Sequence, residues 1–115
     1  MFRKMCRAKI HRAFITKKDY GYKGSIGISG ALLEASGILP NEMVLVLNYN
    51  NGQRFETYVI EEKDAGAIAL YGPAAKLGEV GDELIIMSSV YADEQEAKEM
   101  RMKIVKVDKD NKVIN

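Results

Sequence analysis

A short pattern occurs twice in this chain and constrains its fold more than any other feature. Residues 37–46 and residues 78–87 each contain a glycine, an aliphatic residue two positions later, a glutamate and then four apolar residues. A short segment of helical character precedes each glycine. Two similar halves favour a pseudo-symmetric closed β-barrel, because closure leaves no exposed sheet edge. Turn-then-strand segments also resemble one another by chance, so the pattern alone leaves both explanations open.

Most other local signals indicate strands. Residues 6–11 alternate between apolar and polar, which places Arg7, Lys9 and His11 on one face and Cys6, Ala8 and Ile10 on the other. The pair Asn51-Gly52 predicts a hairpin turn. The expected strands cover residues 6–11, 26–28, 43–47, 53–61, 67–71, 83–90 and 102–107.

Three short helical segments are expected between these strands. The first covers residues 31–36, with Ser29 as a candidate N-cap and Gly37 just past its end. The second is one turn at residues 74–77 after Pro73, and the third is an acidic surface helix at residues 92–100. The expected fold class is therefore mainly β, with short helices.

The size and composition of the chain narrow the possibilities further. A chain of 115 residues with 47% hydrophobic and 29% charged residues is typical of one globular domain, residues 1–115. The single cysteine, Cys6, allows no internal disulfide and predicts no metal cluster. No signal peptide or membrane-spanning run is visible, so a cytoplasmic protein is expected.

Positive charge is concentrated at the beginning of the chain. Seven basic residues and no acidic residue precede Asp19, and they are Arg3, Lys4, Arg7, Lys9, Arg12, Lys17 and Lys18. Such a segment is typical of a solvated strand, but it also fits an anion-binding site or a contact with nucleic acid. The near-zero net charge of +1 argues against nucleic acid.

The pair Gly24-Ser25 gains meaning from the segments around it. Residues 9–13 read Lys-Ile-His-Arg-Ala, and residues 51–60 read Asn-Gly-Gln-Arg-Phe-Glu-Thr-Tyr-Val-Ile. Together, at these separations, the three segments resemble the pyruvoyl-dependent aspartate 1-decarboxylase family from residue 1 to about residue 107. The resemblance implies a double-psi β-barrel that forms a homotetramer with active sites between protomers. It also implies decarboxylation of L-aspartate to β-alanine and CO2, which feeds pantothenate and coenzyme A synthesis.

The resemblance further implies that the chain is a zymogen that cuts itself. The break would fall between Gly24 and Ser25, giving a β chain of residues 1–24 and an α chain of residues 25–115. Ser25 would become the pyruvoyl cofactor, whose carbonyl forms a Schiff base with the substrate and accepts the electrons left by decarboxylation. A glycine at position 24 suits this reaction, because attack needs an unshielded carbonyl and an unusual backbone geometry.

Further roles follow from the same resemblance. Thr57 would donate to the oxyanion during self-processing, and Tyr58 would return a proton to the substrate carbon. Arg54 and Lys9 would bind the two substrate carboxylates, in an order that the sequence leaves open. The remaining implied positions are Gly72, Ala74 and Ala75, with Thr57, around the substrate, and His11 and Tyr22 as supporting residues.

Strand alternation complicates this assignment. It places Arg54 and Tyr58 on one face of their strand and Thr57 on the other. The implied site therefore needs a bulge, a strand end, or residues shared between neighbouring subunits.

The match is weakest around Tyr71. The family usually has Asn-Gly-Ala-Ala-Ala where this chain has Tyr71-Gly72-Pro73-Ala74-Ala75. The tyrosine could slow self-cleavage, reshape the pocket for a substituted aspartate, or be compensated locally, and a helper protein for maturation remains possible. A non-catalytic barrel that binds nucleic acid or protein through its basic N-terminal strand is the alternative from another functional class.

Overall fold

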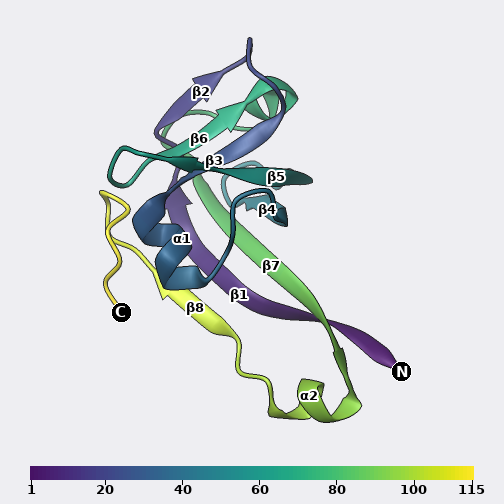
Figure 1. Cartoon of the computed structure of the whole chain (residues 1–115). Helices are drawn as coiled ribbons and strands as arrows, with labels where there is room; N and C mark the ends of the chain where they lie inside the picture. Colours follow the sequence, from purple (N-terminus) through teal and green to yellow (C-terminus); the bar gives the residue numbers. More distant parts are fainter.

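The computed structural model describes residues 1–115 and is drawn in Figure 1. Its strands are β1 (Phe2–Phe14), β2 (Lys17–Asp19), β3 (Ser25–Ser29), β4 (Met43–Asn48), β5 (Arg54–Glu62), β6 (Ile68–Tyr71), β7 (Glu83–Asp93) and β8 (Lys103–Lys106). Its helical segments are α1 (Gly30–Ser36), the 3-10 helix η1 (Gly72–Leu77) and α2 (Glu94–Glu99). The expected mainly β fold with short helices is confirmed. None of the helices is long and apolar enough to cross a membrane.

All eight strands belong to one sheet whose two ends meet. The strand order is β2-β6-β3-β5-β4-β7-β1-β8, so β2 and β1 lie near opposite ends although only Ile15 and Thr16 separate them in the chain. The amide of Ile15 donates to the carbonyl of Asp82 at 2.9 Å, and the amide of Thr16 donates to that of Ile68 at 2.8 Å. This link closes the sheet in the manner of a small barrel, while the double-psi topology stays a prediction.

The repeated sequence pattern corresponds to two matching turns, with a one-residue shift in register. Asn41 and Gly81 both have positive φ, and their amides donate to the carbonyls of Val59 and Ile15 respectively. A carboxylate follows each of them, and it accepts from the amide three residues earlier. The structural repeat is therefore 40 residues rather than the 41 that the glycines suggest, because Gly37 is left-handed whereas Gly78 is extended.

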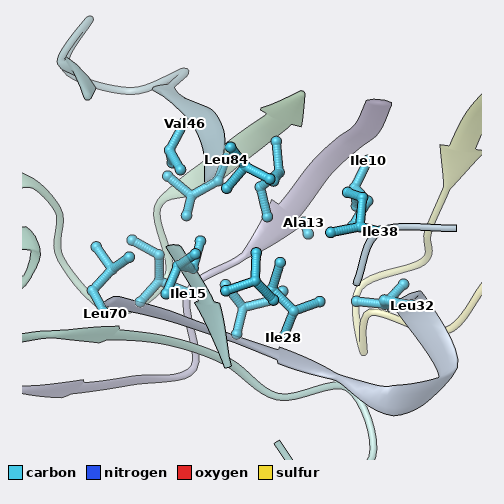
Figure 2. Packing of buried hydrophobic residues seen from close by; sticks show 14 of the residues in the cluster. Ile10, Ala13, Ile15, Ile28, Leu32, Ile38, Val46, Leu70 and Leu84 are labelled. Atoms are coloured by element: carbon cyan, nitrogen blue, oxygen red, sulfur yellow. The ribbon is translucent and has the colours of Figure 1, made fainter. Parts of the chain in front are cut away.

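The centre of the barrel is a cluster of 18 buried apolar residues. Figure 2 shows side chains from several strands meeting those of α1, among them Ile10, Ile28 and Leu32. Burial of each such isoleucine or leucine contributes about 1.5–3 kcal/mol relative to exposure. This core holds β3 and β5 in place, and these two strands carry most of the candidate site.

The expected alternation along β1 is wrong at Cys6. The pairing of β1 with β7 shifts between Cys6 and Ala8, so these two residues face the adjacent positions Ser89 and Ser88 and lie on opposite faces. Cys6 is half-buried on the outer face, whereas Ala8 is fully buried. The cause is a β-bulge at Arg7, which the sequence pattern does not reveal.

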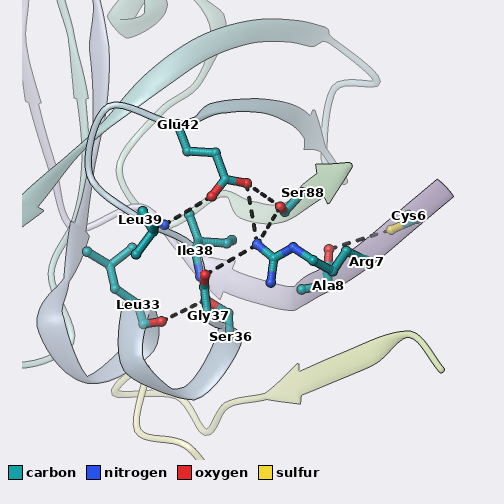
Figure 3. Close-up of polar contacts among 10 residues, drawn as sticks. All are labelled: Cys6, Arg7, Ala8, Leu33, Ser36, Gly37, Ile38, Leu39, Glu42 and Ser88. Atoms are coloured by element: carbon teal, nitrogen blue, oxygen red, sulfur yellow. Dashed lines mark hydrogen bonds and ion pairs between the residues drawn. The ribbon is translucent and has the colours of Figure 1, made fainter. Parts of the chain in front are cut away.

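The bulge turns Arg7 toward neighbouring elements (Figure 3). One guanidinium nitrogen of Arg7 donates to Ser88 Oγ at 2.8 Å and to the carbonyl of Gly37 at 3.3 Å, and it lies 3.5 Å from a carboxylate oxygen of Glu42. Ser88 also donates to Glu42. Arg7 therefore joins the end of α1 to β1 and β7, as a structural residue rather than a free cation.

Beyond the barrel, β1 and β7 continue as a two-stranded arm that carries α2 (Figure 1). Asp93 caps α2 through the amide of Glu96, whose side chain accepts from the amide of Asp93 in return. The expected cap of α1 differs, because Ser29 occupies the N-cap position without a side-chain hydrogen bond. Gly37 ends α1 in the left-handed conformation, as expected.

Candidate active site

The Gly24-Ser25 bond lies where an exposed loop enters the sheet. Ser25 begins β3, is fully buried, and pairs with Tyr71 on β6. Its hydroxyl donates to the carbonyl of Lys23 at 3.4 Å. A side chain on Gly24 would come within 3.2 Å of the Pro73 ring, so glycine suits the crowding at this position. The bond is thus held by the sheet on one side and is approached by a loop on the other.

Gly24 and Thr57 line one cavity. The cavity has a volume of about 310 Å³ and is lined by Gly24, Phe55, Glu56, Thr57, Pro73, Ala74 and Leu77. Thr57 faces inward because its partner on β4 is the buried Val44. The structure therefore brings the proposed oxyanion donor to the same side of the barrel as the carbonyl that would need it.

Arg54 and Tyr58 lie on the outer face of the barrel, as the alternation predicts. They pair with Leu47 and Met43 on β4, and the register between β4 and β5 runs without a shift. No bulge is present in this stretch, so one of the explanations left open by the sequence is excluded. Arg54 is four positions before Tyr58, which corresponds to about 13 Å along an extended strand.

Lys9 shares this outer face but lies far from Ser25. It pairs with Met87, which pairs with Leu45, which pairs with Glu56, so a continuous row crosses the sheet from β1 to β5. Four strand spacings separate β1 from β3 in the sheet order, which is about 19 Å along the surface. A lysine side chain cannot span that distance, so one chain does not bring Lys9 to Ser25.

Tyr58 is the outer-face residue that lies beside Ser25. Ile26 on β3 pairs with Val59 on the parallel strand β5, and both are fully buried. Ser25 and Tyr58 precede these two residues by one position, so alternation turns both side chains to the face of the sheet opposite the core, where Ser25 is nevertheless fully buried. The register thus places Tyr58 next to the residue that the sequence singles out.

His11 belongs to a different cavity. That cavity has a volume of about 470 Å³ and is lined by His11, Arg12, Phe14, Glu83, Lys106, Val107, Asp108, Lys109 and Ile114. Burial, together with the positive charges of Lys9, Arg12 and Lys106, lowers the pKa of His11 below its ordinary value. The buried Nδ1 atom has no hydrogen-bond partner. Within one chain, His11 does not meet Gly24 or Ser25.

The remaining predicted positions divide between the loop, the cavity and the core. Tyr22 is 54% exposed and packs on Tyr71, and Gly72 adopts a positive φ of 62° directly under the loop. Ala74 and Ala75 both belong to the hydrophobic core, and of the two only Ala74 also lines the cavity with Gly24.

Pro73, beside the bond, and Glu62, which binds Tyr71, were not selected by sequence reasoning. Pro73 packs against Gly24, and Glu62 accepts a hydrogen bond from the Tyr71 hydroxyl at 2.7 Å. Burial and this bond raise the pKa of Tyr71 above its ordinary value. Pro73 could have been chosen as a site residue because it directly follows Gly72. Nothing in the sequence marks Glu62 as a partner of Tyr71.

Much of the basic N-terminal charge is balanced by acidic residues from later in the chain. The ion pairs are Arg3 with Glu94, Arg7 with Glu42, Arg12 with Glu83, and Lys18 with Glu79. Four of the seven basic residues thus have a carboxylate partner, which removes most of the uniform positive surface that a nucleic acid would need. No cluster of three or more His, Cys, Asp or Glu side chains is arranged to hold a metal ion.

Comparison with known proteins identifies the family of the chain. The family model for aspartate decarboxylase matches residues 1–114. An aspartate 1-decarboxylase of Thermoanaerobacter pseudethanolicus is 49% identical over 116 aligned positions, covering 100% of this chain and 99% of the relative. Those of Campylobacter jejuni (50%, covering 93% and 85%) and Staphylococcus aureus (49%, covering 99% and 91%) are similar. The chain belongs to the aspartate decarboxylase family.

Proposed function

We propose that this protein decarboxylates L-aspartate to β-alanine and CO2, using a pyruvoyl group made from its own Ser25. The product is the β-alanine that pantothenate synthesis consumes. The observation that carries the proposal is the meeting of Gly24 and Thr57 in one cavity, beside the buried Ser25, in a chain of this family.

Self-processing would divide the chain into residues 1–24 and residues 25–115. The Ser25 hydroxyl oxygen adds to the carbonyl carbon of Gly24, the C–N bond breaks, and the hydroxyl proton passes to the released nitrogen. Loss of the α-proton then expels the Gly24 carboxylate and leaves dehydroalanine at position 25. Water converts this group into a ketone and releases ammonia. Thr57 stabilises the negative charge that develops on the Gly24 oxygen in the first step.

The residues present fit this group. Ser25 is shielded from water, which would protect a reactive ketone from side reactions, and Gly24, which has no side chain, lines the cavity next to it. When formed, the ketone supplies the electron sink that ordinary side chains lack. Tyr58, at the neighbouring register position, delivers the proton that replaces the departed carboxylate.

Substrate binding requires more than one copy of the chain. Arg54 is suited to a bidentate contact with one substrate carboxylate, and Lys9 supplies the second positive charge. Lys9 lies too far from the Ser25 of its own chain to take part there, so it serves the Ser25 of a neighbouring subunit. A homotetramer with shared sites meets this requirement.

The outer face supports such an assembly. It carries a cavity of about 620 Å³ lined by Lys4, Cys6, Met43, Leu45, Glu56, Met87, Ser89 and Tyr91. Met43 and Tyr91 are 56% and 69% exposed, which is unusual for large apolar side chains of a chain that works alone. Contact between copies over this face would cover the apolar residues and bring cations from one copy toward another.

The alternatives receive less support. Tyr71 points to Glu62 and does not line the cavity that holds Gly24, so nothing in the geometry favours a substituted aspartate. Ion pairs engage four of the seven N-terminal basic residues, which disfavours a nucleic-acid or protein-binding barrel.

Two measurements on the purified protein test the proposal. Intact mass under denaturing conditions should show two pieces divided between residues 24 and 25, the larger with a carbonyl at its blocked N-terminus. Turnover should then be faster with aspartate than with 3-methylaspartate. A chain that stays whole after prolonged warming, with and without a cell extract as a source of a maturation factor, would refute the proposed chemistry.

A further inference from the structure

We propose that Tyr71 is a positioning residue for self-cleavage: its ring, anchored by Glu62 and packed on Tyr22, holds the loop before Ser25 against Gly72. The proposal rests on the self-cleavage proposed above. It gives a role to Tyr71, which stands where the family usually has asparagine. It also gives a role to the Glu62 carboxylate, which the proposed reaction does not otherwise use.

The first step is the anchor of the ring. Tyr71 is 5% exposed, and its hydroxyl donates to Glu62 Oε2 at 2.7 Å. Glu62 reaches the hydroxyl by crossing Gly27, where a Cβ atom would collide with the carboxylate. Gly27 pairs with Ala69, and the small size of these two residues leaves space for the hydrogen-bonded side chains of Tyr71 and Glu62. The orientation of the ring is therefore determined by the sheet and not by the loop.

The second step is the contact between the ring and the loop. The centroids of the Tyr22 and Tyr71 rings are 4.8 Å apart, and the ring planes are tilted by 46°. This geometry falls within the preferred range for aromatic pairs. Lys17 Nζ lies 5.5 Å from the centre of the Tyr71 ring as well. Tyr22 is otherwise largely exposed, so Tyr71 is its packing partner in the sheet.

The third step connects this contact to the scissile bond. A Cβ atom on Gly72 would lie 2.6 Å from the Tyr22 carbonyl oxygen and 2.8 Å from the Gly24 nitrogen, so the loop backbone rests directly on this glycine. Ser25, on the other side of the bond, pairs with Tyr71 through the backbone. Tyr71 thus contacts the chain on both sides of Gly24, through its ring and through its strand.

The test compares cleavage rates of freshly purified precursors. Tyr71→Leu removes both ring and hydroxyl and should slow cleavage tenfold or more, whereas Tyr71→Phe keeps the ring and should slow it only a few-fold. Glu62→Ala, which removes the acceptor, should resemble Tyr71→Phe, and the double variant should be no slower than either single one, because both changes break the same hydrogen bond. Tyr20→Leu, which alters an exposed tyrosine of the same loop, is the matched control and should cleave normally.

A second measurement reports on the loop without relying on self-cleavage. In the Ser25→Ala background, trypsin should cut after Lys23 several-fold faster when Tyr71 is changed to Leu. Cutting after the exposed Lys109 should not change, which separates a loosened loop from a misfolded protein. A wild-type chain that never cleaves refutes the proposed function and the positioning role together. A wild type that cleaves, with Tyr71→Leu cleaving equally fast or leaving trypsin cutting after Lys23 unchanged, refutes the positioning role alone.

Discussion

The cleavage region and the outer face of the barrel differ in how much of the site one chain completes. At the cleavage region, Gly24, Thr57 and Gly72 come together from three parts of the chain, in contacts that the barrel itself enforces. On the outer face, Arg54 on β5 and Lys9 on β1 are separated by three strand spacings in the sheet order, about 14 Å.

This difference separates two stages of the enzyme's life. The proposed self-cleavage needs Thr57 near the Gly24 carbonyl, and in a single chain both residues line one cavity. Holding a dicarboxylic substrate needs two cations around one Ser25, and a single chain does not supply them. Under the proposed function, maturation would therefore belong to the folded chain and turnover to the assembly.

The largest effect is expected from Ser25→Ala, which removes the nucleophile of the first stage. The variant should stay intact and have no measurable decarboxylase activity, while its circular dichroism spectrum remains that of the folded precursor. Mass spectrometry and a β-alanine assay are the measurements. Decarboxylase activity in this variant would refute the two-stage scheme, because turnover would then not depend on the processing of Ser25.

Arg54→Ala should impair decarboxylation while leaving self-cleavage nearly intact. Cleavage should proceed at a near-normal rate, because Arg54 does not line the cavity around Gly24. The rate of decarboxylation at low aspartate should fall by roughly 30- to several-thousand-fold, as expected when one partner of a charge-assisted contact is lost. Arg101→Ala, at an exposed position between α2 and β8, is the matched control for removal of a positive charge.

Thr57→Val should affect the first stage in particular. The substitution keeps the shape of the side chain but removes the hydroxyl, so cleavage should slow by about 10²-fold. The time course of chain cleavage on denaturing gels measures this rate. Normal cleavage in this variant would remove Thr57 from the oxyanion role and leave the cavity around Gly24 without its proposed donor.

Mixed assemblies test whether the outer face needs a second copy. Lys9→Ala and Ser25→Ala chains should each be inactive as pure assemblies. Co-expressed and randomly mixed, they should regain about a quarter of wild-type activity, because some sites then combine an intact Lys9 with an intact Ser25 from a neighbour. No recovery, with mixing verified by native mass spectrometry, would place both residues in the site of a single chain.

The smallest effect concerns the pH dependence of stability. Burial and the bond to Glu62 raise the pKa of Tyr71 in the folded state, so the folded chain keeps the phenolic proton at a pH where the unfolded chain loses it. The free energy of unfolding should therefore fall as pH rises above about 10, the ordinary pKa of tyrosine. In the Ser25→Ala background, Tyr71→Phe should show a weaker decline in urea titrations, and equal declines would contradict the buried pair.

Sequence reasoning succeeded where local chemistry determines structure. The hairpin around Asn51-Gly52 and the left-handed Gly37 follow from the backbone freedom of glycine, and the helical turn at Pro73 follows from the fixed φ of proline. It also anticipated the conflict between Thr57 and its neighbours Arg54 and Tyr58, because side chains on a regular strand alternate.

What sequence reasoning missed depends on contacts between distant segments. The bulge at Arg7 accompanies its hydrogen bonds to Ser88 and Glu42, which lie 81 and 35 residues away in the sequence. The pairing of Tyr71 with Glu62 requires the empty space above Gly27, on a third strand. No local pattern records such an arrangement. The glycines of the repeated pattern are 41 residues apart, but the matching turns are 40 residues apart. Long-range hydrogen bonds to Ile15 and Val59 define these turns, and the sequence does not reveal them.

The closed sheet also determines what happens to the two pieces after the proposed cut. Residues 1–24 contribute β1 and β2, which are paired with β7, β8 and β6 of the larger piece. The fragment is therefore retained as a non-covalent component of the barrel, in the way that complementing peptides are. Unfolding then turns one molecule into two, and refolding must bring them together again at a cost in translational entropy. After the cut, neither piece alone can regain the native structure, so the folded state that formed as one chain would have to be rebuilt from two.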